Sequence, residues 1–389
     1  MRIGIFLKDY TPDQGGAHSL LKTIQSEIIQ SNDKSNEYIF LYDGTDKSKY
    51  KIFRDGFYFC NVDSYISALT KVSNNKFTRF ISRLFISKSK FDIIAQKEKI
   101  DLFWFTQPVG YDINYPYIYT VWDLGHRRTP FFPEVSRTDW SWNDRELMYQ
   151  KMLYKASFVI TGNEEGKKEI LENYPMPPNK IHICEFPVAS FCRGDESKPV
   201  FDVPPQSFFY PAQFWPHKNH ICILKALKIL NDEYKINPMI FFTGSDKGNK
   251  EYINKKIIEY HLEEQVKFTG FISDKELKYL YTHTTAMIFA SLMGHNNMPP
   301  IEATYLNCPV IITNLDGHKE QLKDSALYFN GYDPNDLACK MFNILSDESL
   351  RNEIKSRQKS LAEYFDTINY FANIKKIINQ FELIRQTWE

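Results

Sequence analysis

The feature that most constrains the fold is an alternation of apolar runs of strand length with helical patterns. In the first half such runs fall at residues 2–10, 37–43, 100–106, 117–123, 157–162 and 180–186. Between the first two runs, apolar residues follow the helical period at Ala17, Leu20, Leu21, Ile24 and Ile28. Continuous apolar strands are typical of a parallel sheet that is covered on both faces. We therefore predict an α/β fold.

The same alternation restarts in the second half, at residues 207–213, 239–244, 266–270, 286–291, 309–314 and 326–330. A length of 389 residues also suggests two domains, at about 100–200 residues each. Pro, Gly and charged residues interrupt the rhythm before the restart and indicate a linker. We predict a Rossmann-like domain at 1–190, a linker at 191–206, a second Rossmann-like domain at 207–365 and a C-terminal helix at 366–389 that packs back on the first domain.

Composition narrows the class of protein. The 48 basic and 48 acidic residues cancel, so a basic surface that coats nucleic acid is not expected. The sequence contains no run of about 18 apolar residues and no signal-peptide pattern at its start. The six cysteines form no C-x-x-C pair, so neither a zinc site nor a disulfide framework is expected. These features predict a cytoplasmic protein with reduced thiols.

The segment YPAQFWPHKNH, residues 210–220, places charged groups at an expected turn from strand to helix. A helix start presents free backbone N–H groups and the positive end of the helix dipole, which suit an anion. His217 and Lys218 add donors or positive charge there, and the combination fits a diphosphate. The alternative is a solvated lysine at a helix start with Trp215 packed beneath it.

A second segment, residues 291–314, also joins a polar loop to an expected helix, which two prolines open. Backbone N–H groups near Asn297 and Met298 would face outward at this start, with Glu302 in the first turn. N–H groups beside a carboxylate suit a nucleoside diphosphate: the phosphates accept from the N–H groups, and the ribose hydroxyls donate to Glu302.

These two segments resemble the signature of retaining family-four glycosyltransferases with the GT-B fold, in which two Rossmann-like domains face each other across a cleft. That family has an R-x(4)-K-N segment and an E-x(7)-E segment that ends in PPxEA. The similarity extends to residues 120–134 and 154–183 in the first half. The resemblance implies that Lys218 contacts the donor diphosphate, that Glu302 binds the ribose, and that the acceptor binds mainly in the first domain.

Two positions depart from the family pattern. Gln213 stands where the family has arginine, which removes a permanent cation from the phosphate site. Gly294 stands where the family has the first glutamate, which lies near the donor sugar. We therefore expect His295, Asn296 and Asn297 to recognise the sugar, and the sequence leaves the identity of the donor open.

The first half offers candidate groups after two expected strands. Gly15 and Gly16 would let the backbone approach the donor closely, and a simple tight turn is the alternative. His126 would hydrogen-bond the donor sugar or an acceptor hydroxyl, and a structural contact with Asp123 is the alternative. Arg127 adds positive charge for a phosphate-bearing acceptor, or is solvated. We predict Asp123, His126 and Arg127 as acceptor-binding residues.

The sequence contains no D-x-D motif, which holds a divalent ion in the other large glycosyltransferase architecture. We therefore predict a metal-independent reaction with no cofactor beyond the nucleotide sugar. Lys218 and the helix-start amides would stabilise the departing diphosphate, and each donor would contribute roughly 3–4 kcal/mol.

Residues 71–91 contain six basic residues, no acidic residue and one apolar helical face. A basic amphipathic helix of this kind suits an anionic membrane surface, as a lipid-linked acceptor would require. The alternative is a helix that packs its apolar face on the first sheet.

We predict a retaining hexosyltransferase that transfers a sugar to a glycan or lipid-linked glycan in O-antigen, capsule or other surface-polysaccharide synthesis. Lys218, His126 and Glu302 are its predicted catalytic residues. A nucleotide-sugar epimerase is one alternative, and it would act on the donor without an acceptor. A noncatalytic glycosyltransferase-like binding subunit is another, and Gln213 and Gly294 favour it. A dehydrogenase is disfavoured because the G-x-G-x-x-G fingerprint is missing.

Overall fold

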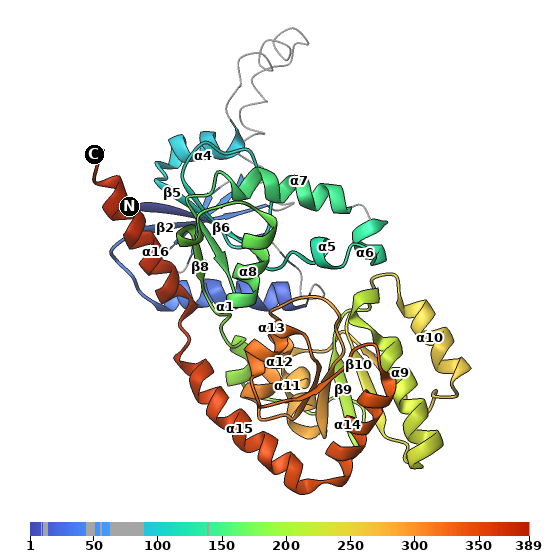
Figure 1. The fold of residues 1–389 in the computed structure, drawn as a ribbon. Helices are drawn as coiled ribbons and strands as arrows, with labels where there is room; N and C mark the ends of the chain where they lie inside the picture. The colour runs from blue at the N-terminus through green and yellow to red at the C-terminus, as the bar shows by residue number, and fades with distance from the viewer. Residues whose placement is uncertain are drawn as a thin grey trace.

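The structure is a computed structural model that describes residues 1–8, 10, 15–43, 51–54, 57–62, 89–137 and 140–388. Within these residues the strands form two sheets, one in each half of the chain (Figure 1). Helices cover the faces of both sheets, as the continuous apolar runs predicted. The predicted α/β fold with two Rossmann-like units is confirmed.

The first sheet has the strand order β3-β4-β2-β1-β5-β6-β7-β8. Its strands are β1 (Arg2–Phe6), β2 (Glu37–Tyr42), β3 (Lys51–Arg54), β4 (Phe57–Asn61), β5 (Leu102–Phe105), β6 (Tyr117–Thr120), β7 (Phe158–Thr161) and β8 (Ile181–Ile183). Their described pairings are parallel, except that β3 and β4 are antiparallel. The β3–β4 hairpin was not predicted, because these edge strands lack the long apolar run of a buried parallel strand.

The second sheet has the strand order β11-β10-β9-β12-β13-β14, and its described pairings are parallel. Its strands are β9 (Ser207–Pro211), β10 (Met239–Thr243), β11 (Val266–Gly270), β12 (Ala286–Phe289), β13 (Val310–Thr313) and β14 (Leu327–Phe329). All six predicted strands of this half are present. Because β9 and β12 are parallel neighbours, the loops that follow them leave the sheet at the same edge.

Helices alternate with these strands. The first-half helices are α1 (Gly16–Gln30), α4 (Lys90–Glu98), α5 (Gly125–Arg128), α6 (Pro133–Ser136), α7 (Trp142–Leu153) and α8 (Glu164–Asn173). The second-half helices are α9 (His220–Ile229), α10 (Lys250–Glu259), α11 (Asp274–His283), α12 (Met298–Tyr305), α13 (Asp316–Leu322), α14 (Pro334–Ser346), α15 (Glu348–Thr367) and α16 (Tyr370–Arg385). Short 3₁₀ turns at Pro178–Lys180, Ser190–Arg193 and Pro216–Lys218 and a π-turn at Leu230–Tyr234 complete the described helical elements.

Local sequence signals explain several helix starts. The Ser141 side chain accepts from the N–H of Asp144, whose carboxylate accepts from the N–H of Ser141, and this capping box begins α7. Ser273 and Glu276 form the same arrangement at the start of α11. Each box satisfies backbone N–H groups that a helix start leaves without a partner.

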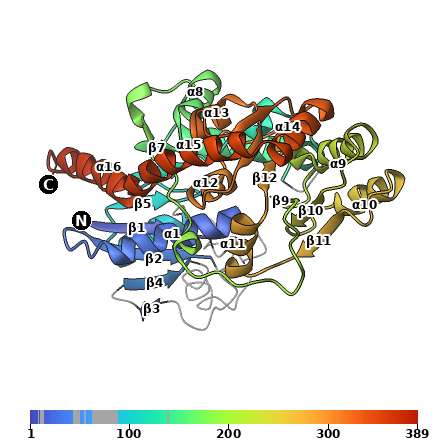
Figure 2. The same ribbon diagram turned by 90° about the horizontal axis from the view of Figure 1, so that it is seen from below.

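The C-terminal helix returns to the first sheet, as predicted (Figures 1 and 2). On α16, the Phe371 ring meets Tyr38 edge to face at 5.5 Å, and the Tyr370 ring stacks on Trp104 at 6.1 Å. Lys375 of the same helix lies 3.0 Å from the carboxylate of Asp33. The chain therefore crosses between the two sheets twice, and the predicted domain boundaries at residues 190, 206 and 365 stay predictions.

Within the described residues, no helix combines the length and the apolar character needed to cross a bilayer. Most of the predicted basic helix at 71–91 lies outside the described residues, which resume at Ser89. Lys90 and Phe91 begin α4, and the Phe91 ring is buried among Phe6, Phe103 and Phe105. A membrane role for residues 71–88 stays a prediction.

Candidate functional site

The turn that holds Lys218 lies at the carboxyl end of β9. Residues Pro216–Lys218 form a 3₁₀ turn and α9 begins at His220, so the predicted turn from strand to helix is present. The hydroxyl of Tyr210 donates to the carbonyl oxygen of Lys218 at 2.8 Å and anchors the turn to its own strand. The turn is therefore attached to the rigid part of the second domain.

The Lys218 ammonium faces the loop that follows β12. Its Nζ lies 3.4 Å from Ser291 Oγ and 5.0 Å from the centre of the Phe289 ring. Burial lowers the pKa of Lys218 to about 8, although the negative charges of Asp123 and Glu134 act in the opposite direction. Both carboxylates belong to the first domain, so the ammonium lies where the two domains meet.

Helix α12 begins at Met298 with two prolines in its first turn, as predicted. Its N-cap, Asn297, makes no side-chain cap; the Asn297 amide instead donates to the carbonyl of Gly294 at 3.1 Å and contacts His318 Nε2 at 3.1 Å. Gly294 has a φ of 95°, and a β-carbon there would lie 3.2 Å from the Asn297 amide. Glycine adopts this left-handed backbone readily, whereas a glutamate in the same conformation would be strained.

The polar groups of the two preceding loop residues face the domain junction. Asn296 Oδ1 accepts from Gln321 Nε2 at 2.6 Å. The His295 carbonyl accepts from Asn163 of the first domain at 2.9 Å, and its buried imidazole lies 3.6 Å from the Glu169 carboxylate. Sugar recognition by these residues stays a prediction, and it would require Asn296 to exchange a contact that it makes in this structure.

Glu302 lies in the second turn of α12 rather than in the first, about 6 Å beyond the helix start at 1.5 Å per residue. Its side chain is buried, and Oε2 accepts from the Tyr281 hydroxyl of α11 at 2.7 Å. Burial raises the pKa of Glu302 to about 7. The carboxylate thus lies deeper than the Lys218 turn, and its predicted contact with ribose stays a prediction.

The two glycines after β1 lie against the second domain. Gly15 has a φ of 67°, and a β-carbon there would lie 3.8 Å from Gln213 Nε2. A β-carbon on Gly16, the first residue of α1, would lie 3.9 Å from Met298. The Gln213 amide donates to Ser245 Oγ at 3.2 Å. The structure therefore brings together four residues predicted to bind the donor.

Asp123 lies three residues beyond the end of β6 and faces the same junction. Its Oδ1 accepts from the N–H of Gly125 at 2.8 Å. A β-carbon on Gly125 would lie 2.5 Å from Met293 Sδ, so the loop after β12 packs directly on this backbone. The negative charge of Asp123 also acts on Lys218 and on His295. Among the three residues predicted to bind the acceptor, Asp123 is the one whose charge acts on these second-domain groups.

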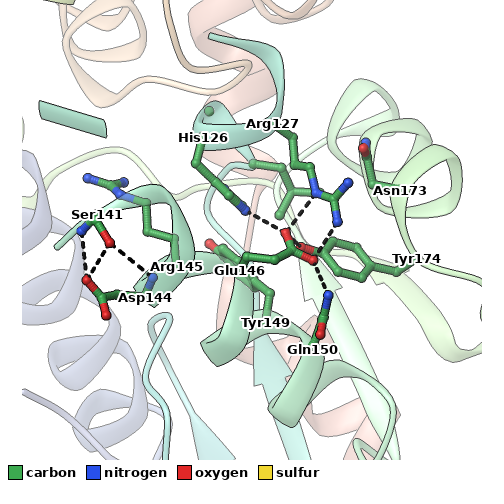
Figure 3. A network of polar contacts seen from close by, with 12 residues as sticks. His126, Arg127, Ser141, Asp144, Arg145, Glu146, Tyr149, Gln150, Asn173 and Tyr174 are labelled. Atoms are coloured by element: carbon green, nitrogen blue, oxygen red, sulfur yellow. Dashed lines mark hydrogen bonds and ion pairs between the residues drawn. The ribbon is translucent and has the colours of Figure 1, made fainter. Parts of the chain in front are cut away.

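His126 and Arg127 instead belong to a polar cluster inside the first domain (Figure 3). His126 Nε2 lies 3.1 Å from the Glu146 carboxylate, and its ring stacks on Tyr149. Arg127 donates to both oxygens of Glu146, at 2.7 and 2.5 Å, and Tyr174 donates at 2.9 Å. The structural partner of His126 is therefore Glu146 of α7 rather than Asp123.

This cluster has a defined charge state. Burial alone would raise the pKa of Glu146, but hydrogen bonds from Arg127, Gln150, His126 and Tyr174 lower it to about 2. Burial lowers the pKa of His126. His126 is 1% exposed, so its predicted contact with a substrate would need this cluster to open. The catalytic and acceptor-binding roles of His126 and Arg127 stay predictions.

One contact at the junction was not predicted. Glu134 of α6 is buried, and its Oε1 accepts from the backbone N–H of His217 at 3.1 Å and contacts the imidazole Nδ1 of the same residue. The two residues are 83 positions apart, and both were within segments that carry the family resemblance. The sequence offered no signal that these two segments touch.

Comparisons with known proteins show what the chain is similar to. Residues 195–361 match the family model for glycosyl transferases group 1. The chain is similar to the O-antigen chain mannosyltransferase RfbU of Salmonella typhimurium, with 27% identity over 243 residues that cover 61% of this chain and 64% of that protein. It is also similar to the O-antigen chain mannosyltransferase B of Escherichia coli, with 22% identity over 62% of this chain and 65% of that protein. The chain thus spans slightly less than two thirds of these relatives.

Solved structures match over nearly the whole chain. Sucrose-phosphate synthase from Thermosynechococcus elongatus has a TM-score of 0.71 at 14% identity and covers both chains completely. The Anabaena protein HepE, solved in complex with UDP, has a TM-score of 0.65 at 12% identity, with 98% of this chain and 100% of that chain covered. At such identity these neighbours establish the fold. Residues 195–361 are therefore similar to the glycosyl transferases group 1, and the chain as a whole has the GT-B fold that its sequence predicted.

Proposed function

We propose that this protein is a glycosyltransferase that moves a sugar from a nucleoside-diphosphate sugar to a hydroxyl of a glycan or lipid-linked glycan, with retention of configuration. The observation that carries the proposal is the half-buried Lys218 ammonium at the carboxyl edge of β9 and β12, opposite Asp123 and Glu134 of the first domain. Ligands of open α/β sheets bind at this edge. O-antigen or another surface polysaccharide is the proposed product, by analogy with the named relatives.

The proposed reaction depends on stabilising the negative charge of the departing diphosphate. When the bond between the sugar and the diphosphate breaks, negative charge develops on the departing oxygen. The Lys218 ammonium and the backbone N–H groups at the starts of α9 and α12 are the donors that would stabilise this charge. The acceptor hydroxyl would attack the face that the diphosphate leaves, and its proton would go to a departing phosphate oxygen. No metal ion is part of this scheme.

We propose that the transferred sugar is mannose. Five curated relatives are named as mannosyltransferases, which is the reason for this choice. Several structural neighbours were solved with UDP, so the experiment must compare uridine with guanosine nucleotides. Because the proposed acceptor is lipid-linked, we also propose that the protein acts at the cytoplasmic face of a membrane.

A noncatalytic binding subunit is the second candidate, and two observations favour it. Gln213 replaces the family arginine, and its amide group contacts Trp215 and Ser245. Gly294 replaces the family glutamate in a backbone conformation that suits glycine. An epimerase is less favoured because the named relatives are transferases.

A two-step experiment tests the proposal. Thermal unfolding is first measured with UDP, GDP, UDP-glucose and GDP-mannose; a ligand at 100 times its dissociation constant adds about 2.7 kcal/mol of stability. Release of free nucleotide from each sugar donor is then measured with and without a glycan acceptor fraction from a lipopolysaccharide-producing bacterium. Nucleotide-dependent stabilisation with acceptor-dependent release is the expected result. Stabilisation without any release would support the noncatalytic subunit, and no stabilisation by any nucleotide would remove both candidates.

A further inference from the structure

We propose that Glu134 is a positioning residue for sugar transfer: it fixes the Lys218 turn from the opposite domain, so that the phosphate-binding cation is in place only when the two domains are closed. This inference rests on the proposed function. Glu134 lies on α6 of the first domain, whereas the turn that it holds belongs to the second domain (Figure 1).

The contact itself is specific. Oε1 of Glu134 accepts from the backbone N–H of His217 at 3.1 Å and contacts the imidazole Nδ1 of the same residue. Glu134 is only 5% exposed. A carboxylate loses several kcal/mol of hydration when it is buried, and it needs directed donors in return. His217 supplies two such donors to one oxygen, which fixes both the backbone and the side chain of this residue.

His217 passes this constraint to the rest of the candidate site. Its carbonyl oxygen accepts from the N–H of Leu292 at 2.9 Å, in the loop that follows β12. Lys218 is the next residue, and its ammonium lies 3.4 Å from Ser291 of the same loop. One residue therefore joins three segments: α6 of the first domain, the turn after β9 and the loop after β12.

The residues around the contact between Glu134 and His217 support the same positioning role. Phe132, two residues before Glu134, meets the His217 ring edge to face at 6.1 Å. Arg145 of α7 donates to the carbonyl of Glu134 at 3.2 Å and so anchors α6 to the body of the first domain. Glu134 is thus held by its own domain while its carboxylate reaches across the junction. Such a support is suited to placing a catalytic group accurately.

A second cross-domain carboxylate provides a matched control. Glu320 of α13 accepts from the N–H groups of Glu164 and Glu165, at 2.7 and 2.9 Å, and caps the start of α8 in the first domain. This contact also ties the two domains together, but it does not involve the Lys218 turn. If Glu134 acts only as a tie between domains, loss of Glu320 should have the same consequences. If Glu134 positions Lys218, the two losses should differ.

The experiment compares Glu134→Ala, Glu134→Gln and Glu320→Gln with the wild-type chain. Dissociation constants for UDP and GDP and the rate of nucleotide release from UDP-glucose and GDP-mannose are measured for each. We expect Glu134→Ala to lower the release rate about 10- to 100-fold, the effect of a displaced catalytic group, and to weaken UDP and GDP binding as well, because the displaced Lys218 ammonium would no longer contact the diphosphate correctly. Glu134→Gln keeps an oxygen that can accept from His217 and should restore most of the rate. Glu320→Gln should leave the rate within about twofold.

His217→Ala provides a second way to remove the side-chain part of the contact if Glu134→Ala folds poorly. It should lower the rate in the same direction, and the double variant should be no slower than Glu134→Ala alone, because both remove one interaction. A wild-type rate in Glu134→Ala, or equal losses of rate in Glu134→Ala and Glu320→Gln, would overturn this inference and leave the proposed function standing. If the wild-type chain binds neither nucleotide, the proposed function fails and the inference falls with it.

Discussion

Two regions of this molecule contain the same kinds of group, a strong cation, a histidine and a buried glutamate, but they combine them differently. In the first-domain cluster, Arg127, His126 and Glu146 all come from one domain and satisfy one another (Figure 3). At the junction, Lys218 and His217 come from the second domain and Glu134 from the first. The comparison teaches that the polar groups of the cluster are satisfied within one domain, whereas the contacts at the junction exist only while the two domains stay together.

The largest expected effect is on stability. Glu146→Ala should lower the free energy of unfolding by about 3–5 kcal/mol, because it leaves Arg127 without its buried partner. Urea unfolding measures this change. Asp144→Ala on the same helix is the control: Asp144 is the exposed N3 residue of a capping box, and its loss should cost much less than the loss of Glu146. Equal costs for the two variants would show that the cluster is not a stabilising unit.

The next effect is on catalysis. Lys218→Ala should lower the rate of sugar transfer about 10²- to 10³-fold, because the departing diphosphate loses a preorganised cation. Its unfolding free energy should not fall, since no described ion pair is broken and the cost of burying the Lys218 charge is removed. Steady-state transfer and urea unfolding of the same preparation test both statements. A Lys218→Ala variant that is unstable but fully active would reverse the roles assigned to the two regions.

The two regions should also differ in their response to pH. The pKa of Lys218 is lowered to about 8, so transfer should decline as pH rises through 8 and the ammonium loses its proton. An unfolded lysine keeps its proton to a higher pH, so the cost of burying the Lys218 charge is fully present below pH 8 and is relieved as pH rises toward the unfolded pKa; the free energy of unfolding should therefore rise across this window. The pKa of Glu146 is lowered to about 2; its contribution to stability is present above the unfolded pKa and is lost as pH falls through 2.

Rate and unfolding profiles between pH 2 and 10 test this contrast. Glu302 has a pKa raised to about 7 and also titrates in the range where activity is measured. Lys218→Arg separates the two, because an arginine stays protonated throughout the range. The alkaline decline in rate should disappear in Lys218→Arg. If the decline persists, the titrating group is not Lys218.

The sequence predicted the parts of the site that follow from periodicity. Continuous apolar runs predicted the parallel strands, and parallel strands bring the loops after β9 and β12 to one edge. The prolines before Glu302 marked the start of α12 within one residue. The sequence did not predict the contacts between distant segments. No local pattern indicates that Glu134 contacts His217, or that His126 contacts Glu146 rather than Asp123. Such pairs are decided by how whole domains pack.

The smallest effect concerns the position at which the sequence departs from its family. Gly294→Glu would restore the family carboxylate, but Gly294 has a φ of 95°, and a side chain there would meet the Asn297 amide. We expect a loss of about 1 kcal/mol in unfolding free energy and no gain in transfer rate. Gln213→Arg is the matched restoration at a residue without this backbone constraint, and it should tighten nucleotide binding by supplying a cation beside the phosphates. A faster Gly294→Glu enzyme would contradict this expectation. It would mean that the loop after β12 can change its backbone to accept a glutamate, and that the junction is less rigid than the contacts in this structure indicate.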